Sequence, residues 1–411
     1  MRYSLLDELR CPACLGPLVC VTASEITSSV PPGRILAGSR ISAGPGIGPA
    51  PAWSTSNAFT QLLDSLAGSP APAGRGNEVE VESGLLLCAC ERWFPIERGI
   101  PELLPDHLRD AARDLSRLDA ARVALPPELG SILRRARPEA PAKTDLGAHH
   151  KRAEIDITSK VDSPAFFEPG YSSPFAHWDS GFSVYLLKLF GAVAPLLALN
   201  RGERVIDSGC GYAWTTEWLF RSGFDPIGVD ICRTYLEVGL TRMGVSRPHL
   251  VIADVENLPF ASGIARAVLA YESFHHIPDR ARAMRAYERV LLDGGVVILA
   301  EPGAAHEQAQ VAIDAMQKYG ILEKGMELSD VLAYAHGTTL AVEQLYLMRM
   351  AHGEVGANAN AAFLKTHSVL EGNLFRLTKC VKPQAPVDRS GPAPRPPKAS
   401  VLRRLWHRLR G

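Results

Sequence analysis

The sequence lacks an excess of charge of either sign, because 44 Lys and Arg balance 44 Asp and Glu over 411 residues. We therefore do not expect the chain to bind nucleic acid through its overall charge, although a local basic patch stays open. Aromatic residues make up only 7%, whereas 35 Gly and 31 Pro indicate long loops. Hydrophobic residues at 46% still allow a buried core, and the length favours two or three domains.

The sequence also has no apolar run long enough to cross a membrane. The most hydrophobic stretch, residues 184–199, is interrupted by Lys188 and Pro195 and is shorter than the roughly 20 residues of a transmembrane helix. Near the N-terminus, Asp7 and Glu8 stand where a signal peptide would have its apolar centre. We therefore expect a cytoplasmic protein.

Cysteine is too scarce for a disulfide scaffold, since the chain has eight in all. Four of them form two close pairs, Cys11 with Cys14 and Cys88 with Cys90. Four thiolates in two pairs suit a tetrahedral zinc site that leaves no open coordination position. We predict one structural zinc on these four residues, with Cys20 as an alternative ligand in place of Cys88.

Composition divides the chain into zones. Residues 22–77 are rich in Gly, Pro and Ser and have few large apolar side chains, so they are predicted to be a disordered insertion within a small N-terminal domain, 1–105. A helical linker, 106–162, follows. The main domain covers 163–382, and a Pro-rich tail covers 383–411.

The tail ends in a short basic amphipathic segment, residues 401–410, with Leu and Trp on one helical face and Arg on the other. This pattern is typical of a helix that lies on an anionic membrane surface, which would give the chain a peripheral membrane contact. Ten residues are few for a stable helix, so a solvated or partner-docking segment is an equal alternative.

Short β-rich runs alternate with helical patterns in the main domain. The runs are 204–207, 226–230, 249–254, 267–270 and 295–300, with helical patterns such as 213–222 and 280–292 between them. Continuous apolar strands separated by helices indicate a parallel sheet that is covered on both faces. The predicted fold class is α/β, a Rossmann-like doubly wound sheet with a small N-terminal zinc ribbon. Two later runs, 344–350 and 373–380, predict an edge hairpin.

The first strand ends in the motif Asp207-Ser208-Gly209-Cys210-Gly211, directly before a helix. In a doubly wound sheet, ligands bind beyond the carboxyl ends of the strands. A dinucleotide site needs a third Gly three residues after the second, and this position is Trp214. Asp207 would also repel a phosphate. The motif therefore favours a cofactor that lacks phosphates and carries a positive charge.

Two further acids close the next two strands. Asp230, nineteen residues after Gly211, is placed to accept the hydroxyls of a ribose. Asp254 follows the third strand and is placed to accept from an adenine amine. An acid at the end of each of three successive strands is a combination that few α/β proteins show, and it indicates a nucleoside site.

These motifs resemble the class I S-adenosylmethionine-dependent methyltransferases, in the group that includes the ubiquinone-biosynthesis and sterol-type enzymes. The matching segments are 207–211, 228–230, 253–260, 274–279 and 291–295. One departure is Arg266, where this group usually has Asp.

The resemblance implies S-adenosylmethionine as the cofactor and a set of residues that hold it. Gly209 and Gly211 would hold its methionine part, Asp230 its ribose, and Asp254 with Val255 its adenine. The implied cofactor-binding set also contains Asp207, Cys210, Ile231 and Tyr271. Cys210 is expected there as a small packing residue and not as a nucleophile.

Two histidines, His275 and His276, follow the fourth strand, where the resemblance places the acceptor side. A hydroxyl acceptor has to lose a proton, and neutral His suits that task. We predict that one of the two is the general base, with a packing or hydrogen-bonding role as the alternative. Tyr271 and Glu272 are second candidates.

Two further resemblances bear on partners. Residues 301–328 resemble methyltransferases found with bacterial polysaccharide-assembly enzymes, which implies a glycan or lipid-linked sugar as the small-molecule acceptor. The cysteine pairs and the neighbouring residues 93–105 are similar to the zinc-ribbon partners that activate tRNA, ribosomal and release-factor methyltransferases. The second pair departs from this family in being C-x-C, with Leu87 at the expected Cys position. An RNA or protein methyltransferase, or a noncatalytic cofactor-binding interaction protein, is the alternative.

Overall fold

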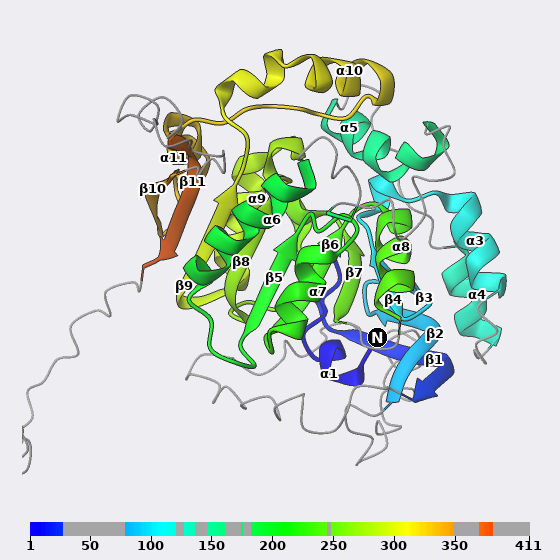
Figure 1. The fold of residues 1–411 in the computed structure, drawn as a ribbon. Helices are drawn as coiled ribbons and strands as arrows, with labels where there is room; N and C mark the ends of the chain where they lie inside the picture. Colours follow the sequence, from blue (N-terminus) through cyan, green and yellow to red (C-terminus); the bar gives the residue numbers. More distant parts are fainter. Residues whose placement is uncertain are drawn as a thin grey trace, which may run out of the picture. The chain divides into compact units, whose positions relative to one another are not determined.

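Parallel strands form the centre of the sheet in this computed structural model (Figure 1). In chain order they are β5 (Arg204–Ser208), β6 (Asp225–Asp230), β7 (His249–Ala253), β8 (Ala265–Tyr271) and β9 (Leu291–Ala300). Their spatial order is β7-β6-β5-β8-β9, so the strand order reverses between β5 and β8. The predicted doubly wound α/β sheet is confirmed.

The structure describes residues 1–27, 79–120, 127–135, 146–160, 174–175, 182–244, 248–348 and 370–380. Most of the predicted insertion, and the whole tail with its basic amphipathic segment, lie outside the described residues. Residues 1–380 form one unit, and the description below concerns this unit. None of the helices in the described ranges has the length and hydrophobicity to span a bilayer.

Helices cover both faces of the central strands, as the continuous apolar runs predict. On one face lie α6 (Phe182–Val193), α7 (Trp214–Arg221) and α8 (Arg233–Met243). On the other face lie α9 (Arg280–Val290) and α11 (Leu328–Ala335). The short helices η4 (Ala194–Leu197), η5 (Val255–Asn257), η6 (Phe274–His276) and η7 (Ala304–Gln308), together with α10 (Gln310–Tyr319), lie in the connections.

A hairpin extends the sheet beyond β9. The strands β10 (Leu340–Met348) and β11 (Leu370–Lys379) pair antiparallel, and β11 also pairs antiparallel with β9. The edge hairpin predicted from the sequence is therefore confirmed, with both strands starting a few residues earlier than expected.

The N-terminal part adds strands at the opposite edge. After α1 (Tyr3–Leu6) come β1 (Leu18–Thr27), β2 (Val79–Cys88), β3 (Trp93–Glu97) and β4 (Ile100–Leu103), which pair antiparallel in sequence order. β4 then pairs parallel with β7, so the described strands form one sheet of eleven. The predicted start of the insertion at residue 22 is corrected, because β1 continues to Thr27 in pairing with β2.

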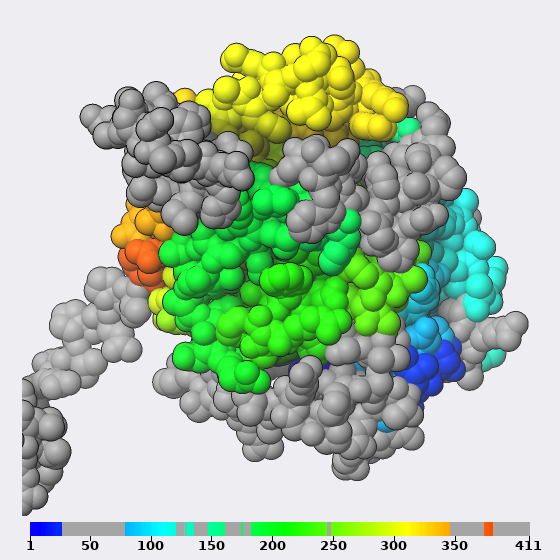
Figure 2. Space-filling view, in the orientation of Figure 1, coloured from blue at the N-terminus to red at the C-terminus, as the bar shows by residue number. Residues whose placement is uncertain are grey.

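The region predicted as a helical linker is helical in its described parts. It contains η1 (Asp106–Leu108), α3 (Ala111–Ala120), α4 (Pro127–Arg135), α5 (Leu146–Ile155) and η2 (Ile157–Lys160). α10 contacts η2. In Figure 1, α5 and α10 both lie beyond the carboxyl ends of the central strands. Figure 2 shows the segment around α10, in yellow, on top of the surface formed by the green residues.

Candidate functional site

A cavity of about 330 Å³ lies at the carboxyl ends of β5, β6 and β7, beside the reversal of strand order. This volume falls in the range of roughly 300–1,000 Å³ that is typical of small-molecule sites. Its lining residues are Lys151, Glu154, Ile157, Gly209, Gly211, Asp230, Ile231, Tyr235, Ala253, Asp254, Val255, Glu272, Ser273, His276, Ile277, Pro278, Ile321 and Glu323.

The glycine motif forms one wall of the cavity. Gly209 and Gly211 have φ angles of +68° and +52°, a conformation that residues with a side chain rarely adopt. A Cβ on Gly209 would stand 2.6 Å from Cβ of Ser273, so the loop can approach η6 only without a side chain there. A Cβ on Gly211 would meet nothing within 4 Å, because it would project into open space at the cavity wall.

Asp230 and Ile231 line the cavity next to this loop. Asp230 accepts hydrogen bonds from the backbone N–H groups of Gly211 and Cys232, both at 2.8 Å. Burial raises the pKa of Asp230 to about 6, and these backbone hydrogen bonds oppose the increase. Each carboxylate oxygen keeps a lone pair, so Asp230 can still accept from the hydroxyls of a ligand.

Asp254 and Val255 line the cavity at the end of β7. Oδ1 of Asp254 accepts from the N–H of Glu256 at 3.0 Å, and Oδ2 accepts from Lys151 Nζ at 2.8 Å and from Asn257 Nδ2 at 3.0 Å. Lys151 Nζ also lies 2.5 Å from Glu256 Oε2. Through these two ion pairs, Lys151 holds α5 against the cavity.

The side chains of Asp207, Cys210 and Tyr271 are engaged outside the cavity lining. Asp207 accepts from the hydroxyls of Thr215 and Thr216 in α7, and burial raises its pKa to about 6. The Tyr271 hydroxyl donates to the carbonyl of Leu186 at 2.7 Å, and Cys210 packs in an apolar cluster with α8. Their predicted cofactor contacts stay predictions.

His275 is buried and is held between two carboxylates. Its Nδ1 lies 2.7 Å from Glu301 Oε2, and its Nε2 lies 3.3 Å from Glu323 Oε2. Burial alone would lower the pKa of His275, but the contacts with Glu301 and Glu323 raise it to about 10. These contacts favour the protonated form of the ring, and His275 does not line the cavity, so its predicted role as the general base stays a prediction.

The adjacent His276 has the opposite character. It lines the cavity, and its Nδ1 lies 2.7 Å from the carbonyl oxygen of Leu322. A carbonyl only accepts, so Nδ1 carries the proton and Nε2 keeps a lone pair. Burial and the positive charge of His275 lower the pKa of His276 to about 3, so its ring is neutral at physiological pH.

Three further carboxylates line the cavity. Glu272, at the end of β8, has a φ of +50° and accepts from the Tyr185 hydroxyl at 3.0 Å. Strained backbone of this kind is found preferentially at functional sites. Glu154 comes from α5 and Glu323 from the segment before α11. Sequence reasoning named Glu272 but missed Glu154, Glu323 and Lys151, because no local motif marks them.

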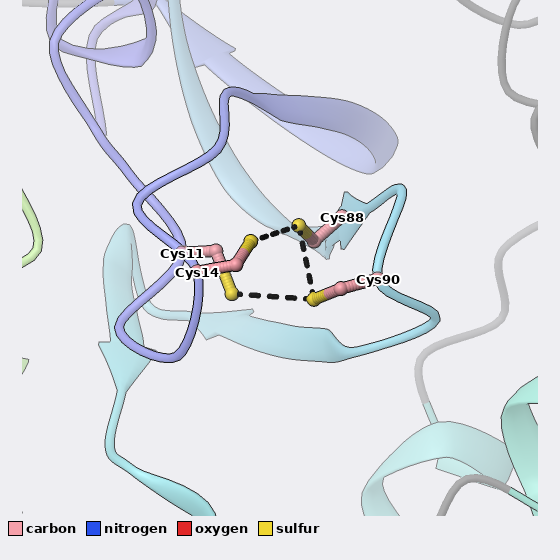
Figure 3. A group of neighbouring side chains, drawn as sticks. All are labelled: Cys11, Cys14, Cys88 and Cys90. Atoms are coloured by element: carbon pink, nitrogen blue, oxygen red, sulfur yellow. Dashed lines mark hydrogen bonds between the residues drawn. The ribbon is translucent and has the colours of Figure 1, made fainter. Parts of the chain in front are cut away.

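The structure brings Cys11, Cys14, Cys88 and Cys90 together (Figure 3). The Sγ–Sγ distances are 3.6 Å for Cys11–Cys90, 3.4 Å for Cys14–Cys88 and 3.2 Å for Cys88–Cys90. Zn–S bonds of about 2.3 Å in a tetrahedron place sulfurs about 3.8 Å apart, so the four thiols fit a zinc ion after a small outward shift.

One backbone contact at this cluster suits a metal-bound thiolate, and the alternative ligand lies outside it. The N–H of Gly16 donates to Cys14 Sγ at 3.4 Å, as it would to a thiolate ligand. Cys20, the alternative ligand, is 3.8 Å from the Thr22 hydroxyl on β1 and is not in the cluster.

Two segments of the chain match different families of known proteins. Residues 206–299 match the family model described as a methyltransferase domain. The chain carries a methyltransferase domain. Residues 2–99 match the model of Trm112p-like proteins, and this match contains the cysteine cluster. The methyltransferase domain contains β5 to β9 almost completely, and with them the glycine motif and both histidines.

The curated relatives that match this chain include several methyltransferases. The chain is 36% identical to methyltransferase GfsG of Streptomyces halstedii over 110 residues, which are 26% of this chain and 40% of that protein. It is 31% identical to the ubiquinone biosynthesis O-methyltransferase of Alkalilimnicola ehrlichii over 109 residues, 26% and 44% of the two chains. The chain thus spans well under two thirds of the length of these relatives.

Among solved structures, a chain in the complex that contains the Haloferax volcanii Trm112 methyltransferase activator is 14% identical, with a TM-score of 0.42. The match covers 54% of the present chain and 100% of that chain.

Proposed function

We propose that this protein is an S-adenosylmethionine-dependent methyltransferase whose cofactor binds in the cavity at the carboxyl ends of β5, β6 and β7. The observation that carries the proposal is the joint lining of this cavity by the glycine motif, Asp230 and Asp254. Gly209 and Gly211 would hold the methionine part, Asp230 the ribose, and Asp254 with Val255 the adenine. The excess of carboxylates suits a cofactor with a positive charge and opposes a pyrophosphate.

We propose a hydroxyl group as the methyl acceptor, with His276 as the general base. Bound S-adenosylmethionine supplies a methyl group on a positively charged sulfur that is a good leaving group. His276 accepts at Nε2 the proton that the hydroxyl loses, while Leu322 fixes its ring through Nδ1. Glu323 Oε1, 3.9 Å from Nδ1, partly offsets the unfavourable effects of burial and of the His275 charge on the imidazolium that results.

The acceptor is proposed to be a small molecule, with a glycan or lipid-linked sugar as the class that the segment 301–328 suggests. The carboxylates Glu154, Glu272 and Glu323 line the acceptor side, and they would repel the phosphates of RNA. A cytoplasmic location and the membrane contact of the tail remain predictions.

We propose a structural zinc ion on Cys11, Cys14, Cys88 and Cys90. The ribbon it would stabilise continues directly into the catalytic sheet, through the parallel pairing of Glu102 and Leu103 with Ile252 and Ala253. The role proposed for the N-terminal part is therefore to support the methyltransferase domain of the same chain.

Calorimetry with S-adenosylmethionine tests the proposal. Wild type and Asp225→Ala should bind the cofactor equally, because Asp225 is at the amino end of β6 and pairs with Arg204. Asp230→Ala, at the carboxyl end of the same strand, should weaken binding at least tenfold, or by about 1.4 kcal/mol or more. The proposal would be refuted if the wild-type protein did not bind S-adenosylmethionine but bound a nicotinamide or flavin coenzyme.

Acceptor screening then separates enzyme from cofactor-binding protein. Fractions of a cell lysate are incubated with the protein and tritiated S-adenosylmethionine, and incorporation of label is followed. Label in a small-molecule fraction is expected. Label in RNA or protein would favour the alternative acceptors, and binding without any transfer would favour the noncatalytic alternative.

A further inference from the structure

More carboxyl groups line the cavity than its own cations compensate. Five carboxylates line it, namely Glu154, Asp230, Asp254, Glu272 and Glu323. The lysine in the lining, Lys151, lies 2.8 Å from Asp254 and 2.5 Å from Glu256, so these two acids already compensate its charge.

Four of the five carboxylates have hydrogen-bond donors within the protein. Asp230 accepts from two backbone N–H groups, Asp254 from Lys151 and Asn257, Glu272 from Tyr185, and Glu323 from His306 at 2.8 Å and from His275. Oε1 of Glu154 differs, because it is buried and has no hydrogen-bond partner. A buried acceptor without a donor costs about 1–3 kcal/mol, and the polarised C–H groups beside a sulfonium can act as weak donors to it.

The charged groups around Glu154 make its ionised form less favourable unless a cation is bound nearby. Asp230 faces it from β6 and Glu323 from the segment before α11, and both add negative charge. His275 and Lys160 are the cations that act on it. His275 lies between Glu301 and Glu323, and Lys160 donates to the carbonyl of Tyr319 at 2.5 Å.

The remaining neighbour, His276, does not supply the missing charge. Its Nδ1 lies 3.7 Å from Glu154 Oε1 but donates to Leu322, and the ring is neutral. Burial, Asp230 and Glu323 together raise the pKa of Glu154 to about 8, so this carboxyl is mostly protonated at pH 7 until a cation arrives.

We propose that Glu154 is the residue that distinguishes the positively charged sulfonium of S-adenosylmethionine from the neutral thioether of S-adenosylhomocysteine. This inference rests on the proposed function, which places S-adenosylmethionine in the cavity. The two compounds differ by one methyl group and one charge, so contacts to adenine, ribose and the amino-acid end cancel in the ratio of their affinities. What remains is the interaction of the sulfonium charge with the cavity, which is strongest with a desolvated carboxylate. The product is then held less tightly than the substrate.

The test measures the affinities of both compounds by calorimetry for wild type, Glu154→Gln and Glu343→Gln. Glu343 is an exposed carboxylate on β10 that pairs with Arg376, so its substitution removes the same charge outside the cavity. Glu154→Gln should reduce the preference for S-adenosylmethionine about tenfold and leave the affinity for S-adenosylhomocysteine nearly unchanged. Glu343→Gln should keep the wild-type preference.

Proton release gives a second measurement. Binding of S-adenosylmethionine ionises Glu154, so the apparent binding enthalpies in phosphate and Tris buffers at pH 7 should differ in the sense of a net proton release. S-adenosylhomocysteine with wild type, and either compound with Glu154→Gln, should show a smaller release.

Three results would overturn the inference. If Glu154→Gln binds both compounds with the wild-type preference, another group senses the charge, while the proposed function stands. If it loses both compounds equally, Glu154 only supports the fold of α5. If wild type binds neither compound, the proposed function fails and this inference fails with it.

Discussion

At the scale of single residues, His275 and His276 show how neighbours in sequence acquire different chemistry. Both lie in η6, and nothing in the local sequence predicts which of the two is the more basic. Their partners come from distant segments: Glu301 follows β9, and Leu322 and Glu323 precede α11. These contacts make His275 a buried cation and leave His276 neutral at the cavity wall.

Substitution of each histidine should therefore have a different effect. His276→Ala should reduce methyl transfer about 10²–10⁴-fold, the usual contribution of a general base, with the cofactor affinity nearly unchanged. The measurement is the rate of S-adenosylhomocysteine release with the acceptor that screening identifies. Transfer at the wild-type rate would exclude His276 as the base.

His275→Ala should act on stability, because it leaves Glu301 and Glu323 without their shared cation. Breaking a buried pair costs about 3–5 kcal/mol, which urea unfolding at pH 7 can measure. The folded pKa of about 10 exceeds the usual 6.5, so the contribution of His275 is complete below pH 6.5 and is lost as pH rises toward 10. Between pH 6.5 and 10, the difference in the free energy of unfolding between wild type and the variant should therefore decrease. A constant difference between the two would contradict the ion-pair role.

The sequence predicts the part of the candidate site that lies on the strands' carboxyl ends. Gly209, Gly211, Asp230 and Asp254 follow buried apolar runs, and a parallel sheet brings such positions to one edge. It does not predict Lys151 or Glu154, because the distance from α5 to the glycine motif along the chain carries no information on where this helix packs.

At the scale of secondary-structure elements, two helical glycines have opposite surroundings. A Cβ on Gly239 in α8 would collide with the backbone carbonyl of Tyr212, next to the glycine motif. A Cβ on Gly191 in α6 would meet nothing within 4 Å. The close approach of α8 to this loop therefore depends on Gly239.

Alanine at these two glycines should change stability in opposite directions. Gly239→Ala should cost about 1–3 kcal/mol through overpacking and should weaken binding of S-adenosylmethionine. Gly191→Ala should stabilise by up to about 1 kcal/mol, because Ala is the better helix former. Thermal and urea unfolding of both variants provide the test. Equal effects would show that the packing of α8 on the loop is not tight.

Most element boundaries follow from the apolar runs, and the exceptions have tertiary causes. The helix pattern 280–292 ends at Val290, and β9 starts at Leu291, because Leu291 pairs with Ala265 ahead of the register shift that precedes the pairing of Val296 with Ala267. β1 reaches Thr27 for a similar reason, its pairing with β2. Cross-strand pairing of this kind cannot be found in a local window.

At the scale of the whole unit, one buried carboxylate joins three parts of the chain. Glu102 in β4 lies 2.9 Å from Arg117 Nη1 in α3 and 2.6 Å from Arg233 Nη2 in α8. Burial would raise the pKa of Glu102, but the two guanidinium groups lower it below 4.5. The N-terminal strands, the linker and the methyltransferase domain thus share this ion pair.

Glu102→Gln should cost about 3 kcal/mol at pH 7, because it removes the buried carboxylate between Arg117 and Arg233 and leaves the more exposed Glu97 as the carboxylate that both still contact. Since the folded pKa is lowered, the contribution of Glu102 is present above about pH 4.5 and is lost as pH falls below that value. Glu237→Gln, which removes a half-buried partner of Arg233, should cost no more than about 1 kcal/mol. Unfolding curves between pH 4 and 7 test both. Equal costs would contradict the joining role of Glu102.

Removal of the metal should also affect more than the ribbon. We expect about one zinc per chain, lost in Cys88→Ser and kept in Cys20→Ser, as element analysis would show. Chelation should increase hydrogen exchange first in β1 to β4 and then in β7, through the shared hydrogen bonds. A protein purified with no zinc would end the metal proposal.

The parallel pairing of β4 with β7 has a consequence for how the two parts meet. Two separate polypeptides joined along such an edge would come apart on dilution, and their ratio would depend on how much of each a cell makes. Here one polypeptide chain connects them, so the stoichiometry is fixed at one to one and the interface forms at any protein concentration. Hydrogen exchange at β7 should therefore be the same in nanomolar and micromolar solutions.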